Sequence, residues 1–173
     1  MANMYMRIDG ITDFKGMATV KEVAGKKGLF PIDNMDYGFS RAIFVDVGSS
    51  GDAETGVPAL SDITVSRMED GASALLQTLF FSPGDKGKTI EFIATRTAND
   101  GKGLQPTQVI TLEEARVSTY AAGGGASTIG IAYTTIAIAH YFANEAGAVE
   151  KSDTVKFDLR SGELVSGNQD AMK

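Results

Sequence analysis

The sequence predicts a mainly β fold, a small antiparallel β-barrel of two packed sheets with one α-helix on its flank. Two observations carry this prediction. Short segments of alternating apolar and polar residues recur along the chain between turns rich in Gly, Asn and Asp. One segment switches to the helical period, which leaves roughly seven to nine strands for the core. The 173 residues suit one domain, which we place at residues 1–166, with 167–173 as a frayed tail.

The composition excludes several classes of protein. The chain carries 16 basic and 22 acidic side chains, a formal charge of −6, and it has no cysteine. Without cysteine there are no disulfides, thiol enzymes or cysteine-ligated metal sites. The negative charge argues against a nucleic-acid partner, because phosphate binding depends on clustered Lys and Arg.

The first strands alternate clearly. Residues 4–9 read as a strand rather than a signal peptide, since a basic start and an apolar stretch are both missing. We therefore expect any export to proceed without a cleaved leader. Residues 29–39 continue in an extended pattern around Pro31, which suits a strand start or a sheet edge. Residues 61–67 alternate again and predict a further strand.

A long extended loop is predicted at residues 41–58. Most connections within a domain have about 4–6 residues, so a segment of this length is usually functional or disordered. It contains glycines and acidic residues together with a short apolar cluster that includes Phe44 and Val45. That cluster should be covered by something.

The only helix predicted spans about residues 72–81. Its apolar residues repeat with a spacing of three and four, which places them on one helical face. Asp70 or Ser73 can cap the first turn by accepting backbone N–H bonds. Pro83 then stops the helix, because proline cannot continue the hydrogen-bond ladder.

Strands return at residues 88–97, 107–112, 115–121 and 154–159, and the longest is predicted at 129–141. From Ile136 onward this long strand is apolar or small on both faces. It is too short and too rich in β-branched residues for a membrane-spanning helix, so we expect no membrane insertion.

Two interpretations of its apolar faces stay open. The same chain covers the strand, or another subunit buries one face. The second interpretation makes Ile136, Ile138 and His140 candidates for a subunit interface.

We expect no enzyme. His140 is the single histidine, so it is the only imidazole that could act as the base for a nucleophile. A histidine-based metal site would have no second imidazole. The Gly-x-Ser-x-Gly elbow of many hydrolases is missing. We therefore predict no catalytic, metal or cofactor-binding residues, and an interaction protein rather than an enzyme.

Specific motifs extend the prediction of an interaction protein. The segment Pro58-Ala-Leu-Ser-Asp-Ile-Thr-Val65, followed by Asp70-Gly-Ala-Ser-Ala-Leu75, resembles the central signature of the haemolysin-coregulated proteins (Hcp). These are the tube subunits of bacterial type VI secretion systems. The segments 90–92, 110–120 and 136–141 are similar to later strands of that family. Residues 28–38 resemble an early family strand only loosely, because its tryptophans are missing here.

The resemblance implies a flanked β-barrel that assembles as a homohexameric ring. Stacked rings form a tube that a contractile sheath expels behind a spike protein, and small effector proteins travel in the lumen. Such a subunit is cytoplasmic when assembled and is then secreted to the medium or a target cell. Alignment on the family strand places Asn34 and Asp36 toward the channel. Phe44 and Val45 become candidates for contact with a neighbour or with the next ring.

Two alternatives stay open. One is a tail-tube or baseplate protein of a phage-like contractile particle, which shares the architecture but not the export role. The other is a monomeric β-barrel that binds a small ligand in its interior. Native mass separates the second from any tube subunit.

Overall fold

The structure, a computed structural model, describes residues 3–13, 15–16, 18–44, 47–48 and 54–166. This part of the chain forms one helix, α1 (Ser73–Phe81), and fifteen strands. In chain order the strands are β1 (Asn3–Ile8), β2 (Phe30–Ile32), β3 (Asn34–Asp36), β4 (Phe39–Ser40), β5 (Ile43–Phe44), β6 (Glu54–Thr55), β7 (Ala59–Leu60), β8 (Ile63–Met68), β9 (Lys88–Thr97), β10 (Leu104–Gly123), β11 (Ala126–Ala132), β12 (Thr135–Ala143), β13 (Val149–Lys151), β14 (Val155–Asp158) and β15 (Glu163–Ser166).

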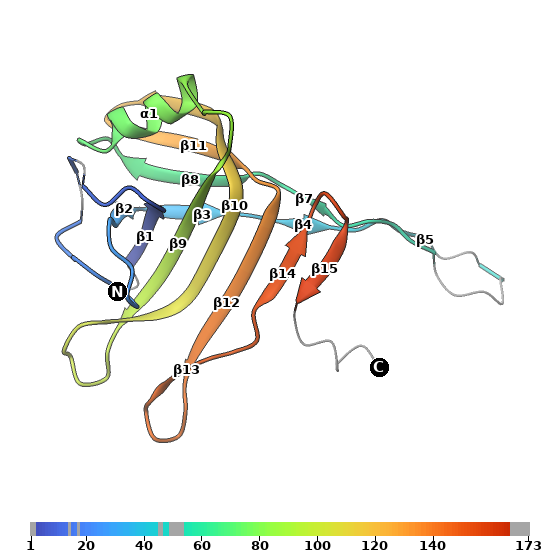
Figure 1. Cartoon of the computed structure of the whole chain (residues 1–173). Coiled ribbons are helices and arrows are strands. Elements are labelled where there is room, and N and C mark those ends of the chain that lie inside the picture. The colour runs from blue at the N-terminus through green and yellow to red at the C-terminus, as the bar shows by residue number, and fades with distance from the viewer. Residues whose placement is uncertain (1–2, 14, 17, 45–46, 49–53, 167–173) are drawn as a thin grey trace.

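Eleven strands form one antiparallel sheet that folds over into two layers (Figure 1). The first layer has the order β2-β1-β9-β10-β12-β14-β15, with β13 added to β12. The second layer has the order β10-β11-β8-β3. The short pairs β4–β7 and β5–β6 form an arm that extends away from these layers. The helix α1 lies beside β10 at one end of the layers.

Strand β10 belongs to both layers, because it turns a corner near its middle. Its first half pairs with β9 and β12, and its second half pairs with β11. The register with β9 shifts between Leu112 and Ala115, and Glu114 takes a positive φ of 49°. Such a bulge bends a strand sharply. Gly87 crosses the corner so closely that a Cβ there would lie 2.3 Å from the carbonyl carbon of Glu114.

The main core fills the space between the two layers and α1. The strands alternate, so every second side chain points inward. The buried side chains of this core are Met6, Ile8, Phe30, Ile32, Ile63, Val65, Ala72, Leu76, Ile90, Phe92, Ile110, Leu112, Ala115, Val117, Ile129, Ile131, Ile136 and Ile138.

A second, smaller core lies on the outer side of the first layer. The connection between β1 and β2 folds over this side and contributes Val23 and Leu29. They pack against Tyr5, Ile93 and Val109 from three neighbouring strands. Because of this cover, β9 is buried on both faces along most of its length, with Phe92 in the main core and Ile93 in the second.

The structure confirms the mainly β class, with two packed layers of sheet and a flanking helix. The helix begins one residue later than predicted, and the carboxylate of Asp70 accepts the Ala72 N–H at 2.8 Å. Among the described strands no pairing joins β15 to β3, so the barrel is open on that side. The predicted tail at 167–173 lies outside the described residues.

Two details of the prediction were wrong. The longest strand is β10, which unites the two segments predicted at 107–112 and 115–121. The predicted strand 129–141 is instead divided between β11 and β12 by a turn at Tyr133 and Thr134. The long loop predicted at 41–58 carries one short strand pair of the arm, β5–β6, and the pair β4–β7 flanks it.

The close approach at the corner predicts that alanine substitutions at two glycines differ sharply in their effect on stability. Gly87→Ala places a methyl group on the backbone of Glu114, so we expect it to lower the free energy of unfolding by about 2 kcal/mol or more. Gly123→Ala is the control, because a Cβ there meets nothing within 4 Å, and it should change stability by less than about 0.5 kcal/mol. Urea denaturation followed by circular dichroism measures both, and equal effects would contradict the close approach.

Candidate functional site

The arm presents apolar side chains to solvent. Its base is the β4–β7 pair, and Gly56 N–H donates to the Ala42 carbonyl at 2.9 Å farther out. Ile43 and Phe44 on β5 are 58% and 67% exposed. Val47 is fully exposed as well, whereas Val45 lies outside the described residues. A group of large apolar side chains on a protruding hairpin is typical of a surface that another chain covers.

An apolar groove of about 190 Å³ opens beside the base of the arm. It lies at the open side of the barrel, where β12, β14 and β15 face β4 and β7. Its wall consists only of apolar residues, namely Phe39, Pro58, Leu60, Ile136, Ile138, Val155, Phe157 and Leu164. Val155 is 45% exposed at the rim. The groove could therefore accept an apolar side chain without leaving a polar group unpaired.

The three residues predicted for a subunit interface share one face of β12. Ile136 and Ile138 are 2% and 7% exposed and belong to the main core, so their own chain already covers most of their surface. Both also form part of the groove wall. His140 lies farther along the strand and is exposed, and its carbonyl accepts the N–H of Ser152 at 2.8 Å. Their contact with another subunit stays a prediction.

The residues predicted to face the channel lie on β3, at the edge of the second layer. Asn34 and Asp36 are both exposed and point away from the core, while Met35 between them packs inward. The Asn34 amide donates to the Asp36 carboxylate at 2.8 Å. The two side chains thus lie on one outer surface, and its place toward a channel stays a prediction.

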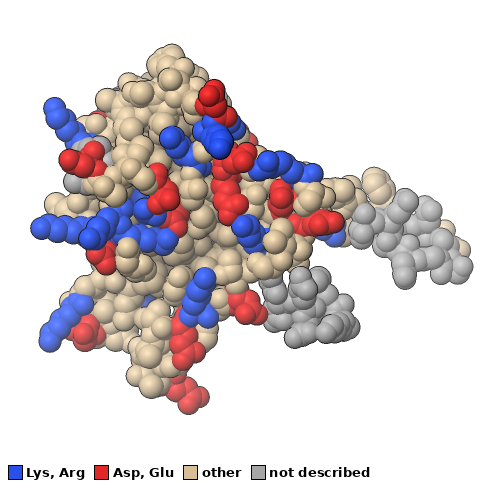
Figure 2. Space-filling view, viewed as in Figure 1, with Lys and Arg blue, Asp and Glu red and all other residues tan. Residues whose placement is uncertain are grey.

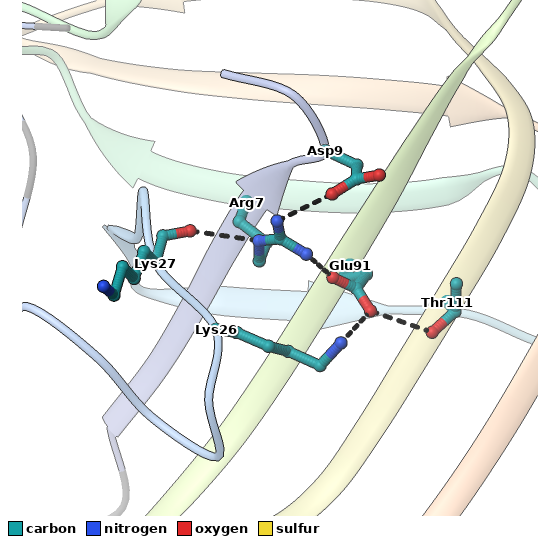
Figure 3. Close-up of polar contacts among 6 residues, drawn as sticks. All are labelled: Arg7, Asp9, Lys26, Lys27, Glu91 and Thr111. Atoms are coloured by element: carbon teal, nitrogen blue, oxygen red, sulfur yellow. Dashed lines mark hydrogen bonds and ion pairs between the residues drawn. The ribbon is translucent and has the colours of Figure 1, made fainter. Parts of the chain in front are cut away.

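A compact group of charges lies on the outer side of the first layer (Figure 3). Glu91 on β9 is 5% exposed, and its two carboxylate oxygens accept bonds from Arg7 and Lys26. Arg7 also donates to the Asp9 carboxylate at 2.8 Å and to the Lys27 carbonyl at 3.0 Å. These contacts fasten the connection that covers the second core, so we interpret the group as structural.

The phenol of Tyr133 has a strongly shifted pKa. Burial of its ring raises the pKa of the phenol to about 12 from the usual 10.0, and the negative charge of Asp62 adds to the shift. The Tyr133 hydroxyl donates to the Ser61 carbonyl at 3.0 Å, and Ser118 donates to the Asp62 carboxylate at 2.7 Å. The first bond ties the turn between β11 and β12 to the segment that precedes β8, and the second ties that segment to β10.

The described part of the chain offers no group of three or more His, Asp or Glu side chains that could hold a metal ion. Its helix is also too short to cross a membrane. What the arrangement can do chemically is bind: a protruding apolar arm and an open apolar groove stand next to each other. The sequence analysis identified Phe44, which lies on the arm, as a candidate for contact. It did not predict the groove, because Val155 and Leu164 in the groove wall show only the ordinary alternation of a strand.

The comparisons with known proteins agree with the resemblance to the Hcp family. A family model described as "Type VI secretion system effector, Hcp" matches residues 5–140. A solved type six secretion system protein superposes with a TM-score of 0.77 at 19% identity, covering 95% of this chain and 99% of that chain. Hcp1 from Salmonella typhimurium gives 0.63 at 14% identity over 95% and 99% of the two chains. Hcp1 from E. coli EAEC 042 gives 0.60 at 15% identity over 87% and 96%. No curated protein matches the sequence.

The charge group yields a prediction on stability. Glu91→Ala leaves Arg7, whose side chain is 11% exposed, without its buried partner, and should lower the free energy of unfolding by about 3 kcal/mol. Glu22→Ala is the control, because its pair with Lys27 is 3.9 Å long and exposed, and should cost less than about 1 kcal/mol. Urea denaturation measures both, and a loss at Glu91 no larger than that at Glu22 would refute the buried pairing.

Tyr133 yields a prediction on pH. Its pKa in the folded chain is about 12, above the usual 10.0, so the stability that the neutral phenol supplies is complete below pH 10.0. That stability is lost as the pH rises from 10.0 through 12. We expect the urea midpoint of the wild type to fall more steeply across this range than that of Tyr133→Phe. Parallel pH profiles of the two proteins would contradict the shift.

Proposed function

Because the chain belongs to the Hcp family of type VI secretion system effectors, we propose that it is a structural subunit of the secretion tube. Six copies form a ring, and the rings stack into a tube that a sheath expels with its spike. The subunit works by binding its own copies and carries no catalytic step. It assembles in the cytoplasm and leaves the cell with the tube, taking small effector proteins in the lumen.

The observation that supports this proposal best is that each chain carries both an exposed apolar arm and an open apolar groove. The exposed Phe44 and Ile43 of one copy would pack onto the next copy, beside or within its groove. Such a contact joins two different patches, and it closes into a ring when the rotation per copy is a whole fraction of a turn. Burying one Phe side chain contributes about 1.5–3 kcal/mol to each contact.

The native mass tests the proposal directly. Light scattering on a sizing column should give the mass of six chains, and negative staining of that peak should show rings. An 18.2 kDa monomer at every concentration would overturn the proposal and leave the monomeric ligand-binding barrel, with the apolar groove as its site. Rings that never reach the medium through a type VI apparatus would instead point to a phage-like contractile particle.

The arm provides the mutational test. Phe44→Asp places a charge on an exposed position, so the monomer should keep its circular dichroism spectrum and stability while the ring dissociates. Phe81→Asp is the matched control, because Phe81 is 82% exposed at the end of α1, away from the arm and groove. Equal ring content in both variants would remove the arm from the interface.

The Ile138→Asp variant tests the placement of Ile138 at the subunit seam. Ile138 is 7% exposed in the main core, so we expect this variant to unfold or aggregate rather than to yield folded monomers. Thermal unfolding followed by circular dichroism shows which occurs. A stable Ile138→Asp hexamer would make the placement of Ile138 at the subunit seam wrong.

A further inference from the structure

A positive charge lies inside the core of the second layer. Figure 2 shows many charged side chains on the surface turned to the viewer, but among the charged residues of the described chain Arg67 and Glu91 are buried. Arg67, near the end of β8, is 1% exposed, and its guanidinium carbon lies 5.4 Å from the centre of the Phe30 ring. Burying a charge is costly unless its polar atoms find partners, so each N–H group of this guanidinium has to be accounted for.

Both terminal nitrogens of Arg67 bind the start of α1. Nη2 donates to the Asp70 carboxylate at 2.5 Å, and Nη1 donates to the Ser73 hydroxyl at 3.2 Å. The same carboxylate oxygen accepts the Ala72 N–H at 2.8 Å, and the same hydroxyl oxygen accepts the Asp70 N–H at 3.1 Å. The arginine therefore holds the beginning of the helix against β8.

The remaining donor of Arg67, its Nε–H, has no hydrogen-bond partner among the described residues. Directly opposite on β11 stands Ser127, which is 2% exposed and whose hydroxyl also finds no partner in the described part of the chain. Residues that pair directly across an antiparallel sheet project to the same face, with Cβ atoms about 4.5–5.5 Å apart. A buried donor and a buried hydroxyl thus lie at neighbouring positions on one face.

These two groups differ in their height above the sheet. The Oγ of Ser127 is attached directly to Cβ, whereas the Nε of Arg67 stands near the far end of its aliphatic stem. A water molecule suits this difference, because it can accept from the Nε–H and donate to the Oγ at the same time. An ion suits it less well, because the charge of Arg67 is already paired with Asp70 and a further charge would stay unbalanced in the core.

A close crossing of two loops shuts this end of the core. Gly16, in the connection between β1 and β2, lies so near the start of α1 that a Cβ there would be 2.5 Å from the Ala72 nitrogen. It would also be 2.9 Å from the Asp70 carboxylate oxygen that binds Arg67. Since Arg67 and Ser127 are almost fully buried, a molecule held between them leaves only when contacts of this kind open locally.

We propose that a buried water molecule bridges the Nε–H of Arg67 and the hydroxyl of Ser127. The water completes the hydrogen bonding of the buried guanidinium and links β11, through Arg67, to the start of α1. It also explains why a small polar residue stands opposite the arginine. The site belongs to the single chain, so it goes beyond the tube function and is present whether the chain is free or in a ring.

A high-resolution crystal structure of the wild type tests the bridge directly. We expect a water peak within about 2.7–3.2 Å of both the Nε of Arg67 and the Oγ of Ser127. A direct contact between the two atoms, a peak near only one of them, or no peak would each overturn the proposal. None of these outcomes bears on the formation of rings, which the native mass measures separately.

A matched pair of variants tests the site in solution. Magnetic relaxation dispersion of solvent water counts long-lived buried water molecules. Ser127→Val removes the hydroxyl and places methyl groups at the water position, so we expect the count to fall by about one per chain. Ser66→Val is the control, because Ser66 precedes Arg67 on β8 and points to the opposite face of the sheet, and the count should stay unchanged.

Circular dichroism shows whether both variants keep the fold. An unchanged count in folded Ser127→Val, or an equal loss in both variants, would contradict the bridging water. If Ser127→Val does not fold, the crystal structure of the wild type decides alone.

Discussion

The corner in β10 is the constraint on which the rest of the structure depends. One strand supplies pairing partners to β9 and β12 before the corner and to β11 after it, so the two layers share a single backbone. The corner exists because Glu114 takes a left-handed conformation and because Gly87 lets the entry to β9 pass against it. The core, the helix and the open side of the barrel all follow from the angle set there.

The sequence predicted the elements whose evidence is local. The helix was found because its apolar period is regular, and most strands were found because their core faces alternate. The two errors around the corner have a physical cause. The pair Glu113 and Glu114 resembles a break between strands, but it is a bulge whose polar side chains stay at the surface. The turn at Tyr133 and Thr134 lacks Gly and Pro, and it is held instead by Thr134 N–H donating to the Glu113 carbonyl at 3.1 Å.

The candidate site was predictable only in part, because the arm and groove have different origins. The arm is one continuous segment, so its length and its apolar residue Phe44 were visible in the sequence. The groove arises where β12 meets β14 and the base of the arm, which depends on pairings between distant segments. Ile136 and Ile138 show the consequence: their apolar character was correctly noticed, but burial within their own chain accounts for most of it.

The strand pairs of the arm have a consequence for the rate at which copies would join in the proposed ring. A flexible loop of this length would have to become ordered on contact, at about 1–2 kcal/mol for each residue fixed. Here the β4–β7 and β5–β6 pairs hold the arm in shape before a second copy arrives. That conformational entropy is lost during folding of the monomer and not during association. In the proposed ring, a larger fraction of random collisions between copies would therefore be productive, because the paired strands of the arm are ordered before contact.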